Sequence, residues 1–576
     1  MDNSKIADSF DELAELLEFR GENPFRVRAY RNGARAIRQL DESVLSIVLD
    51  PSRSLSDIPG IGSTLAEKTR TLIETGSLPQ LESLRQAVPE SVLAMTRIPG
   101  LGAKKAAVLH LELSIDSLED LRQACEAGEV RKLKGFGAKT EQMILAGLQI
   151  AQAANERIYW SAADELVAHI SQHMQVCRGI EQMEWAGSYR RGRETVGDLD
   201  LLVVATDRDQ AMDRFESYPN RTQTIARGEQ KKISIRVGKA FQVDMRLVDA
   251  EEFGAALQYF TGSKEHNVHL RRLAAARGLK INEYGVFRDS DNQRVGGSTE
   301  QEVYGAVGLP WIPPELREDR QEFTLAQQEA LPQLITESMM IGDLHMHTSA
   351  TDGTATIREM ADAAIAQGLQ YIAITDHSKR VSMANGLDAD RARAQWKVID
   401  SLRDEYAGRL TILKGIECDI LEAGGMDLPD DCLAEADWVL ASVHYGQRQP
   451  RQQITDRILG AIENPHVDCI AHPTGRLINR REPYDVDVET VIKAAAANGT
   501  LLELNANPAR LDLNDIHLAA AKRLGVKFVI NTDAHSTDGL SVMRFGILQA
   551  RRGGLTSADV VNSEAGRAFL DRLADE

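Results

Sequence analysis

The sequence predicts a multidomain protein with an all-α N-terminal region, an α+β centre and a C-terminal barrel of alternating strands and helices. Three observations lead to this fold class. Gly-x-Gly turns recur between helix-forming segments near the N-terminus, an alternating strand begins with Asp198-Leu-Asp200, and histidines follow short apolar strands after residue 339. At 576 residues the chain is too long for one core, since domains of about 150 residues are usual.

The composition is that of an ordinary soluble globular protein, with 43% hydrophobic and 27% charged residues. No segment approaches the roughly 20 apolar residues of a membrane span, and the N-terminus lacks the features of a signal peptide. We therefore expect a cytoplasmic protein that does not bind membranes. The five cysteines include no Cys-x-x-Cys pair, so neither a disulfide framework nor a cysteine-based zinc site is expected.

Positive charge is concentrated close to the N-terminus. The formal net charge of −19 argues against a polyanionic partner, but affinity for phosphate depends on local patches of charge. Residues 20–38 contain six arginines and a single acid, Glu22. Such a run fits a solvated helix face as well as a nucleic-acid-binding surface, and the turns that follow it favour the second interpretation.

Three short turns of similar sequence come next, at residues 58–62, 98–102 and 133–137. The first reads Ile-Pro-Gly-Ile-Gly, and each precedes a helix-forming segment. This is typical of a helix-hairpin-helix, in which glycines adopt positive φ and the first N–H groups of the helix bind a phosphate. One Gly-x-Gly turn also suits a plain helix connection, but three in series predict sequence-independent binding of the DNA backbone. The predicted DNA-binding residues are Gly60, Gly62, Gly100, Gly102, Gly135 and Gly137.

The central segment combines Gly187-Ser-Tyr-Arg-Arg-Gly192 with Gly197-Asp-Leu-Asp-Leu-Leu-Val-Val204. Residues two apart on a strand point the same way, so Asp198 and Asp200 share one face. A second alternating strand, residues 241–247, contributes Asp244 on its polar side. Three neighbouring carboxylates repel one another unless cations neutralise them, and two Mg²⁺ ions would also stabilise the oxygens of an in-line phosphoryl transfer. The spacing predicts a nucleotidyl-transfer site rather than a polar strand edge.

These motifs, with Tyr259-Phe-Thr-Gly-Ser263 and Ile281-Asn-Glu-Tyr284, resemble family X DNA polymerases over residues 5–310. The resemblance implies a nucleotidyltransferase palm with a thumb. It makes Asp198 and Asp200 ligands of two Mg²⁺ ions, for which Mn²⁺ can substitute, and Asp244 the ligand that helps activate the primer 3′-hydroxyl. The nucleotide-binding residues that it implies are Gly187, Ser188, Arg191, Gly197, Tyr259, Phe260, Gly262, Asn267 and Arg271.

The resemblance implies that Ser188 and Arg191 hold the triphosphate. It also implies that Asn267 and Arg271 probe the minor-groove side of the nascent base pair. The same resemblance aligns Lys68 with the Schiff-base lysine that removes a 5′-deoxyribose phosphate, a reaction that needs an unprotonated amine. Two positions depart from the family pattern. Thr64 stands in place of a phosphate-binding lysine, which bears on the lyase reaction, and Val196 replaces a small hydroxyl residue near the triphosphate.

The C-terminal segment places histidines and acids at the ends of short apolar strands that alternate with helical segments. This is the pattern of a β/α barrel, whose ligands gather at the C-terminal rim of the strands. A single buried histidine is usually structural, but six histidines and three acids in such places predict a site for zinc, manganese or iron, with Glu417 able to bridge two ions. Clustered metals activate a bound water that attacks phosphorus.

The order of these residues resembles the polymerase and histidinol phosphatase (PHP) domain over residues 339–570. The resemblance implies a distorted (β/α) barrel with a trinuclear site for Mn²⁺ or Zn²⁺, and Asp376 is the less certain neighbour of this site. The ligands that it implies are His345, His347, Asp352, His377, Glu417, His444, His472, Asp533 and His535.

The motifs divide the chain into six segments. They are a helix-hairpin-helix, lyase-like DNA-binding domain (1–90), fingers with further helix-hairpin-helix motifs (91–150), palm (151–250), thumb (251–318), a polar linker (319–338) and a PHP metallophosphoesterase domain (339–576).

The leading functional hypothesis is a monomeric repair polymerase that fills short gaps in DNA, of the base excision repair type. It would use primed or gapped DNA and dNTPs, and its PHP domain would supply a 3′→5′ exonuclease, with apurinic-site endonuclease or 3′-phosphatase activity as further options. Three alternatives remain open: a nuclease whose palm has lost polymerase activity, a non-catalytic scaffold that holds DNA ends, and a small-molecule phosphatase of the histidinol phosphate type. No protein partner is predicted.

Overall fold

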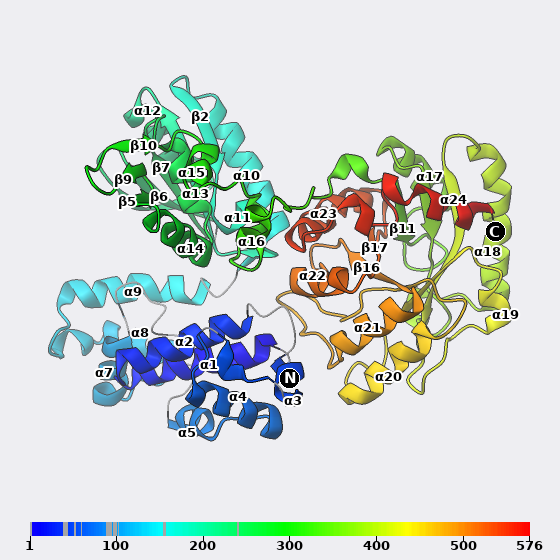
Figure 1. Cartoon of the computed structure of the whole chain (residues 1–576), viewed down its shortest axis with the longest axis horizontal. Helices are drawn as coiled ribbons and strands as arrows, with labels where there is room; N and C mark the ends of the chain where they lie inside the picture. Colours follow the sequence, from blue (N-terminus) through cyan, green and yellow to red (C-terminus); the bar gives the residue numbers. More distant parts are fainter. Residues whose placement is uncertain are drawn as a thin grey trace. The chain divides into compact units, whose positions relative to one another are not determined.

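The structure is a computed structural model that describes residues 3–38, 44–50, 53–58, 60–87, 95, 101, 103–153, 157–238 and 241–575 (Figure 1). Its internal contacts divide the chain into two compact units. The first comprises Met1–Arg157, Gln172–Met183 and Gly197–Val248, and the second comprises Ile158–Ser171, Glu184–Val196 and Asp249–Glu576. In the part of the chain that is described, no helix has the length and apolar character needed to cross a bilayer.

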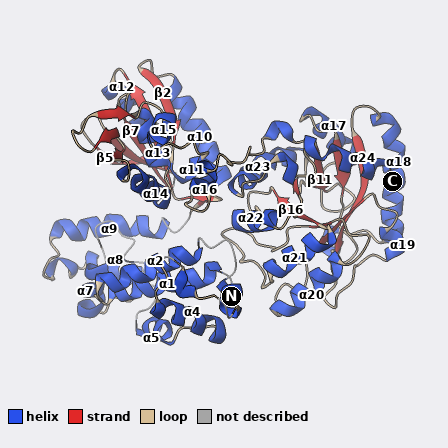
Figure 2. Cartoon of the chain, in the orientation of Figure 1, coloured by secondary structure: helices blue, strands red, loops and turns tan. Residues whose placement is uncertain are grey.

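The N-terminal region consists of helices, without strands in its described residues (Figure 2). The helices are α1 (Asn3–Phe19), α2 (Pro24–Arg38), α3 (Val44–Leu49), α4 (Ser63–Thr75), α5 (Pro79–Ala87), α7 (Ala103–Leu113), α8 (Leu118–Glu126) and α9 (Ala138–Ala153). Each of these helices contributes apolar side chains from its buried face to one cluster, which includes Phe10, Leu13 and Leu121. The periodic apolar residues of each helix therefore build a single core.

One of the predicted hairpin turns is described in detail. A short 3₁₀ turn (Leu55–Asp57) leads into it, the N–H of Ile61 donates to the carbonyl of Ile58 at 3.0 Å, and α4 follows. Gly60 has φ +97°, in the left-handed region that strains residues with a Cβ. Gly62 is the N-cap of α4, and a Cβ placed there would meet no atom within 4 Å. The turn thus presents open backbone at the start of a helix, as the glycine pattern predicts.

The palm is a five-stranded sheet in the order β2-β4-β7-β6-β5, with β4 parallel to β7 and β6 antiparallel to it. The strands are β2 (Ile180–Trp185), β4 (Asp198–Ala205), β5 (Arg221–Arg227), β6 (Lys232–Val237) and β7 (Phe241–Leu247), and β1 (Ile158–Tyr159) pairs separately with β3 (Thr195–Val196). The helices of this region are α10 (Trp160–Gln175), α11 (Gly187–Arg190) and α12 (Arg208–Glu216). Strand β4 lies between β2 and β7, and because it is apolar after its first three residues, most of it is buried.

The thumb follows the palm and packs around its own apolar cluster. Its elements are α13 (Phe253–Thr261), α14 (Lys264–Ala275), β8 (Leu279–Asn282), β9 (Gly285–Arg288), β10 (Arg294–Gly296), α15 (Glu300–Ala306) and α16 (Glu322–Gln327). Helix α16 lies in the segment expected to be a linker. Its Phe323 and Ala326 are buried in the same cluster as Leu270 and Val303 of the thumb, so this polar stretch is folded onto the thumb.

A buried ion-pair network fixes the start of α15. The carboxylate of Glu300, 5% exposed, accepts hydrogen bonds from Arg190 (2.8 and 2.9 Å), from Arg317 (2.6 Å) and from the indole of Trp311 (2.8 Å). Burial acts to raise the pKa of Glu300, but Arg317 and Arg190 outweigh it and hold the pKa well below its usual value. The carboxylate is therefore ionised and forms ion pairs with two guanidinium groups inside the protein.

Glu300→Ala is expected to destabilise the thumb by about 3–5 kcal/mol, because it leaves buried guanidinium charge without a partner. Native-state hydrogen exchange measures this, through faster exchange of the amides of α13 and α15 with no change in the C-terminal strands. The control is Gln301→Ala, which truncates an exposed side chain of the same helix. Equal exchange rates in the two variants would contradict the role given to Glu300.

The C-terminal domain is built on a sheet of seven parallel strands in sequence order, β11 to β17. The strands are β11 (Gly342–Met346), β12 (Tyr371–Ile374), β13 (Thr411–Asp419), β14 (Trp438–Ser442), β15 (Cys469–Ile470), β16 (Leu501–Asn505) and β17 (Phe528–Asn531). The helices are α17 (Ile357–Ala366), α18 (Ala389–Tyr406), α19 (Asp430–Leu433), α20 (Arg451–Ile462), α21 (Val488–Asn498), α22 (Asp515–Arg523), α23 (Met543–Arg552) and α24 (Arg567–Asp575).

The first and last strands of this sheet approach each other. A parallel bridge joins Met346 to Ala534, and the N–H of His347 donates to the carbonyl of Ala534 at 2.8 Å. The sheet is therefore a nearly closed parallel barrel, as the sequence predicts. In such a barrel the residues that follow the strands meet at one rim.

Candidate metal centres

The palm sheet brings the three predicted aspartates onto two neighbouring strands. The parallel ladder between β4 and β7 pairs Asp200 with Asp244 and places Asp198 opposite Gln242. Asp244 is 6% exposed, whereas Asp198 lies at the exposed start of its strand. The alternation of each strand fixes which side chains share a face, and the ladder adds the pairing between the strands.

Two cations accompany these carboxylates. The Nζ atom of Lys232, on β6, lies 2.6 Å from Oδ2 of Asp244, and Arg246 lies 3.7 Å from Asp244 and 3.9 Å from Asp200. The sequence analysis did not single out either residue. Arg246 lies on the polar side of the strand that contains Asp244, and this alternation is the pattern that could have predicted it. Lys232 lies close to Asp244 only because β6 pairs with β7.

The pKa values in the palm reflect crowded negative charge. Burial, and then the charge of Asp198, raises the pKa of Asp200 to about 6. Burial also acts to raise the pKa of Asp244, but Lys232, Ser234 and Gln242 outweigh it and lower the pKa. Excess carboxylate charge on one sheet edge suits divalent cations. The tight groups of potential ligand atoms found among the described residues do not include the three aspartates. Asp244 contacts Lys232 and Arg246 instead, and Asp200 contacts Arg246.

The predicted nucleotide-binding residues, apart from Gly197, belong to the second compact unit. Gly187 and Ser188 begin the short helix α11, with φ +67° at Gly187, and Arg191 follows it. The guanidinium of Arg191 donates to the carbonyl of Thr261 and contacts Glu318 at 3.2 Å. A Cβ on Gly262 would lie 3.2 Å from Nη1 of Arg191, so glycine is required where α13 ends beside this arginine.

The predicted minor-groove residues lie on α14. Asn267 is 8% exposed; its Nδ2 donates to the carbonyl of Tyr259 at 2.7 Å, and its Oδ1 accepts from Gln258. Asn267 therefore holds the backbone of Tyr259 in place, where Tyr259 and Phe260 form an edge-to-face pair with ring centroids 5.1 Å apart. Arg271 is exposed. Direct contacts of these two residues with DNA stay a prediction.

The predicted DNA-binding glycines are described in part. Gly60 and Gly62 flank the turn before α4, Gly135 (φ +89°) and Gly137 precede α9, and Gly100 and Gly102 lie outside the described residues. Lys68 lies on α4 and donates from Nζ to Oε1 of Gln80 at 2.8 Å. Its role in lyase chemistry also stays a prediction.

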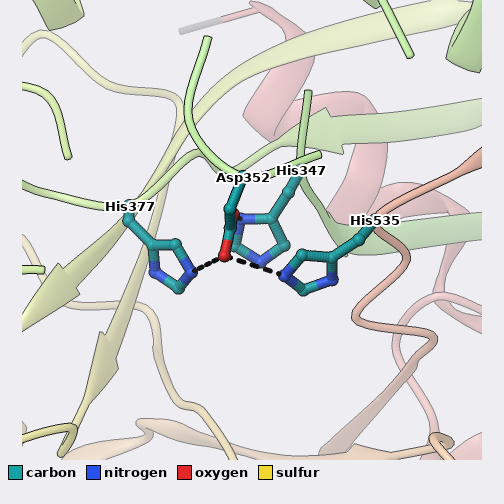
Figure 3. A group of neighbouring side chains, drawn as sticks. All are labelled: His347, Asp352, His377 and His535. Atoms are coloured by element: carbon teal, nitrogen blue, oxygen red, sulfur yellow. Dashed lines mark ion pairs between the residues drawn. The ribbon is translucent and has the colours of Figure 1, made fainter. Parts of the chain in front are cut away.

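The barrel rim brings together all nine predicted metal ligands. His345 and Glu417 lie on strands, and the others follow strands β11, β12, β14, β15 and β17. Three groups of these side chains could each hold a cation, because the potential ligand atoms within each group all lie within 4.8 Å of one another. The groups are His347, Asp352, His377 and His535 (Figure 3); His345, His347 and Asp533; and His377, Glu417 and His444.

Glu417 lies at the centre of this arrangement. Its Oε2 is 2.7 Å from His377, 3.6 Å from His345 and 3.7 Å from His347. Its Oε1 is 2.9 Å from His472 and 3.5 Å from His444. One oxygen of this carboxylate faces each histidine set, an arrangement in which a carboxylate could bridge two cations.

The buried side chains at the rim fit a metal site. Among the described residues, Nε2 of His345, both ring nitrogens of His347 and Oε2 of Glu417 are buried without a hydrogen-bond partner, a costly condition that coordination of a cation relieves. Burial acts to raise the pKa of Glu417, but the surrounding histidines outweigh it and hold the pKa well below its usual value. Asp352 and His535 are 35% and 40% exposed, which leaves this side of the rim open to a substrate.

Outer residues orient the ligands, and two of them, Glu503 and Asp419, were not predicted from the sequence. Nδ1 of His345 lies 2.7 Å from Glu503 on β16, and Nδ1 of His444 lies 3.2 Å from Asp419 on β13. Such partners fix the tautomer of a histidine so that Nε2 faces the metal. Asp376 is also an outer residue, since it accepts hydrogen bonds from Thr348 at 2.6 and 2.9 Å. An acid within an otherwise apolar strand, as in Leu501-Leu-Glu-Leu-Asn505, is the pattern that could have found Glu503.

Five family models match successive parts of the chain. They describe a helix-hairpin-helix domain (residues 1–78), a SAM-like helix-hairpin-helix tandem (52–114 and 94–149), a DNA polymerase beta palm (157–236), a DNA polymerase beta thumb (256–318) and a PHP domain (343–507). The matches follow the order of the folded regions described above.

Three curated proteins illustrate the likeness. The DNA polymerase/3′-5′ exonuclease PolX of Bacillus subtilis (strain 168) is 42% identical over 577 residues, which cover 99% of this chain and 100% of that protein. DNA polymerase lambda of Rattus norvegicus is 27% identical over 343 residues, 55% of this chain and 56% of the rat protein. A probable phosphatase of Thermoanaerobacter sp. (strain X514) is 32% identical over 241 residues, 40% of this chain and 92% of that protein.

Proposed function

The chain belongs to the family X DNA polymerases that carry a C-terminal PHP domain, and from this premise we propose how its two metal centres divide the work. The enzyme is a DNA polymerase with a 3′→5′ exonuclease. The palm extends a primer across short gaps, and the barrel rim removes nucleotides from 3′ ends. One observation carries this proposal: a single chain holds a carboxylate pair on adjacent palm strands and a nine-residue ligand set at a barrel rim.

In the palm, we assign the binding of two divalent cations, Mg²⁺ or Mn²⁺, to Asp198, Asp200 and Asp244. Such cations neutralise the charge that develops on the attacking and leaving oxygens. Asp244, which contacts Lys232, would help to activate the primer 3′-hydroxyl. Ser188 and Arg191 bind the triphosphate, and the contact of Asn267 with the Tyr259 carbonyl sets the backbone against which the sugar lies.

In the barrel, the nine residues would hold up to three Mn²⁺ or Zn²⁺ ions, which when bound would activate a water for phosphodiester hydrolysis. Glu417 would be shared between ions and offset part of their charge, while Glu503 and Asp419 keep two of the histidines in the tautomer that leaves Nε2 for a cation. The exposed edge at Asp352 and His535 admits the 3′ end of the DNA strand. The helix-hairpin-helix turns bind the DNA backbone without sequence preference.

Removal of divalent cations is expected to abolish both activities. The palm also carries a pH dependence: Asp200 has its pKa raised to about 6, so below that pH it is increasingly protonated and binds cations less well. The Mg²⁺ concentration for half-maximal primer extension should therefore rise as the pH falls below about 6 and be constant well above it. Metal titrations of primer extension across this range measure the effect. A half-maximal Mg²⁺ concentration that is independent of pH would contradict the assignment of Asp200 as a ligand.

A second activity of the barrel is the removal of a 3′-phosphate. The likeness of the C-terminal part to a probable phosphatase favours it, since hydrolysis of a phosphomonoester and of a phosphodiester needs the same activated water. A primer that ends in a 3′-phosphate tests the proposal, because extension by the palm requires that the phosphate first be removed.

A further inference from the structure

Helix α23 of the barrel domain packs against the segment that is proposed to bind the triphosphate, residues 187–196. Both belong to the second compact unit. Three side chains of α23 contact this segment. Leu548 packs against Gly192 so closely that a Cβ on Gly192 would lie 2.6 Å from it. Gln549 donates to Glu194 at 2.7 Å, and Arg552 donates to the carbonyl of Arg191 at 2.7 Å. The nucleotide-binding segment therefore rests on the nuclease domain.

Arg552 is the buried centre of this contact. Its side chain is 1% exposed, and besides the Arg191 carbonyl it contacts Glu318 at 2.9 Å and Asp515 at 2.7 Å. A buried guanidinium needs such partners because desolvation of its charge is costly. Arg552 thus ties together the barrel (Asp515), the end of the thumb (Glu318) and the backbone of the triphosphate segment.

Glu318 links Arg552 to the side chain of Arg191. The same Oε1 atom lies 2.9 Å from Arg552 and 3.2 Å from Nε of Arg191. Burial acts to raise the pKa of Glu318, but Arg552 and then Arg191 outweigh it and hold the pKa at about 2. The carboxylate is therefore charged at neutral pH, and it orients the two guanidinium groups with respect to each other.

These contacts leave a defined part of Arg191 for a ligand. Its Nε contacts Glu318, and its Nη1 donates to the carbonyl of Thr261 at the end of α13. Among the contacts of the described residues, this leaves both N–H groups of Nη2 and the second N–H of Nη1 to donate to phosphate oxygens. A guanidinium fixed at two of its nitrogens is preorganised and loses less freedom when it binds an anion.

The far end of the segment is held by the barrel as well. Arg476, which follows β15, forms a bidentate pair with Glu194 at 2.6 and 3.2 Å, and the N–H of Trp160 donates to the Glu194 carbonyl at 3.0 Å. The segment is therefore clamped at Arg191 and at Glu194 by residues of the PHP domain.

We propose that Arg552 of the barrel and Glu318 are positioning residues for polymerization, which hold Arg191 in the orientation that binds the nucleotide triphosphate. This inference rests on the proposed role of Arg191. It makes the nuclease domain a structural part of the polymerase nucleotide site, in addition to its own hydrolytic activity.

The experiment compares single-nucleotide incorporation on gapped DNA by the full-length wild type, Arg552→Gln and Glu318→Gln. Loss of orientation at Arg191 should raise the KM for dNTP about tenfold, the effect of one charge-assisted hydrogen bond, with little change in kcat. Hydrolysis of a primer 3′ end, which uses the barrel rim, should be unchanged. If Arg552→Gln does not fold, Glu318→Gln decides, because it keeps the shape of the side chain and removes only its charge.

The matched control is Arg544→Gln. Arg544 also lies on α23 and pairs with Asp164 of α10 at 2.8 Å, but it makes no recorded contact with Arg191 or Glu318 among the described residues. An equal rise in KM in this control would mean that general docking of α23 matters and would overturn the positioning role. An unchanged KM in Glu318→Gln would overturn it as well.

Arg191→Lys separates this inference from the function on which it rests. If Arg191→Lys leaves the KM for dNTP unchanged, the proposed role of Arg191 is wrong. If Arg191→Lys raises the KM while Arg552→Gln and Glu318→Gln do not, only the positioning role is wrong. If both the role of Arg191 and the positioning role of Glu318 are correct, the double variant Arg191→Lys/Glu318→Gln should have the same KM for dNTP as Arg191→Lys alone. The effects of residues that act through one another are not additive.

Discussion

Asp244→Ala is expected to lower the rate of nucleotide addition on gapped DNA by about a thousandfold, comparable to the loss of a group that stabilises transition-state charge. Asp244 is the buried member of the palm carboxylates and lies opposite Asp200 in the β4–β7 ladder. Its removal takes away a cation ligand and leaves Lys232 without its carboxylate partner. Primer extension with a labelled gapped substrate measures the loss.

Two controls make this result specific to the palm. Asp209→Ala removes an exposed carboxylate on α12 of the same domain and should extend primers like the wild type. The 3′→5′ exonuclease of Asp244→Ala should be retained, because its ligands belong to the barrel. Absence of nucleotide addition in the wild type would favour a nuclease with an inactive palm, and salt-dependent DNA binding without any turnover would favour a scaffold.

In the palm, the alternation along each strand predicts which side chains share a face but not which strands pair. Alternation places Asp198 and Asp200 on one face and Asp244 on the polar side of its own strand, because side-chain direction is a local property. Which strand pairs with which is not local: β5 and β6 lie between β4 and β7 in sequence, yet β7 pairs with both β4 and β6. Lys232 reaches Asp244 through that pairing alone, so its role could not be predicted from its own neighbours.

The arrangement of the barrel rim could be predicted more fully than that of the palm, because the order of the strands in the sequence is also their order around the barrel. Parallel strands that follow one another around a barrel all end at the same rim, so the sequence alone places the histidines that follow β11, β12, β14, β15 and β17 close to one another. The grouping of the nine ligands depends on side-chain geometry, as in the central place of Glu417 between two histidine sets. Glu503 and Asp419 were not predicted because an acid within an apolar strand indicates a candidate residue, but this pattern does not distinguish an outer partner from a ligand.

The contact between α23 and the triphosphate segment lies beyond sequence reasoning altogether. Arg552 ends an ordinary amphipathic helix, and nothing in its neighbours predicts that its side chain is buried against Glu318 and the Arg191 carbonyl. Contacts of this kind join residues more than 200 positions apart and depend on how whole domains pack. Sequence motifs describe each domain separately, so they predict the two metal centres but not a contact between the barrel helix and the triphosphate segment.

His347→Ala is expected to lower the 3′→5′ exonuclease activity by roughly a thousandfold while primer extension is preserved. His347 belongs to two of the three ligand groups, one with Asp352 and one with Asp533, so its loss weakens more than one cation position. Its two buried ring nitrogens have no hydrogen-bond partner among the described residues, and coordination of cations is the role that explains them. Shortening of a labelled primer in the presence of Mn²⁺ measures the activity.

A histidine outside the rim provides the control. His466→Ala alters a partly buried histidine of the same domain that is remote from the ligand groups, and it should digest primers like the wild type. Metal analysis of the purified proteins adds a readout independent of activity, since His347→Ala should retain fewer ions than His466→Ala. A variant that lost its ions and still shortened primers would place the nuclease elsewhere. Loss of primer extension together with the exonuclease would instead show that His347 supports the fold that the palm depends on.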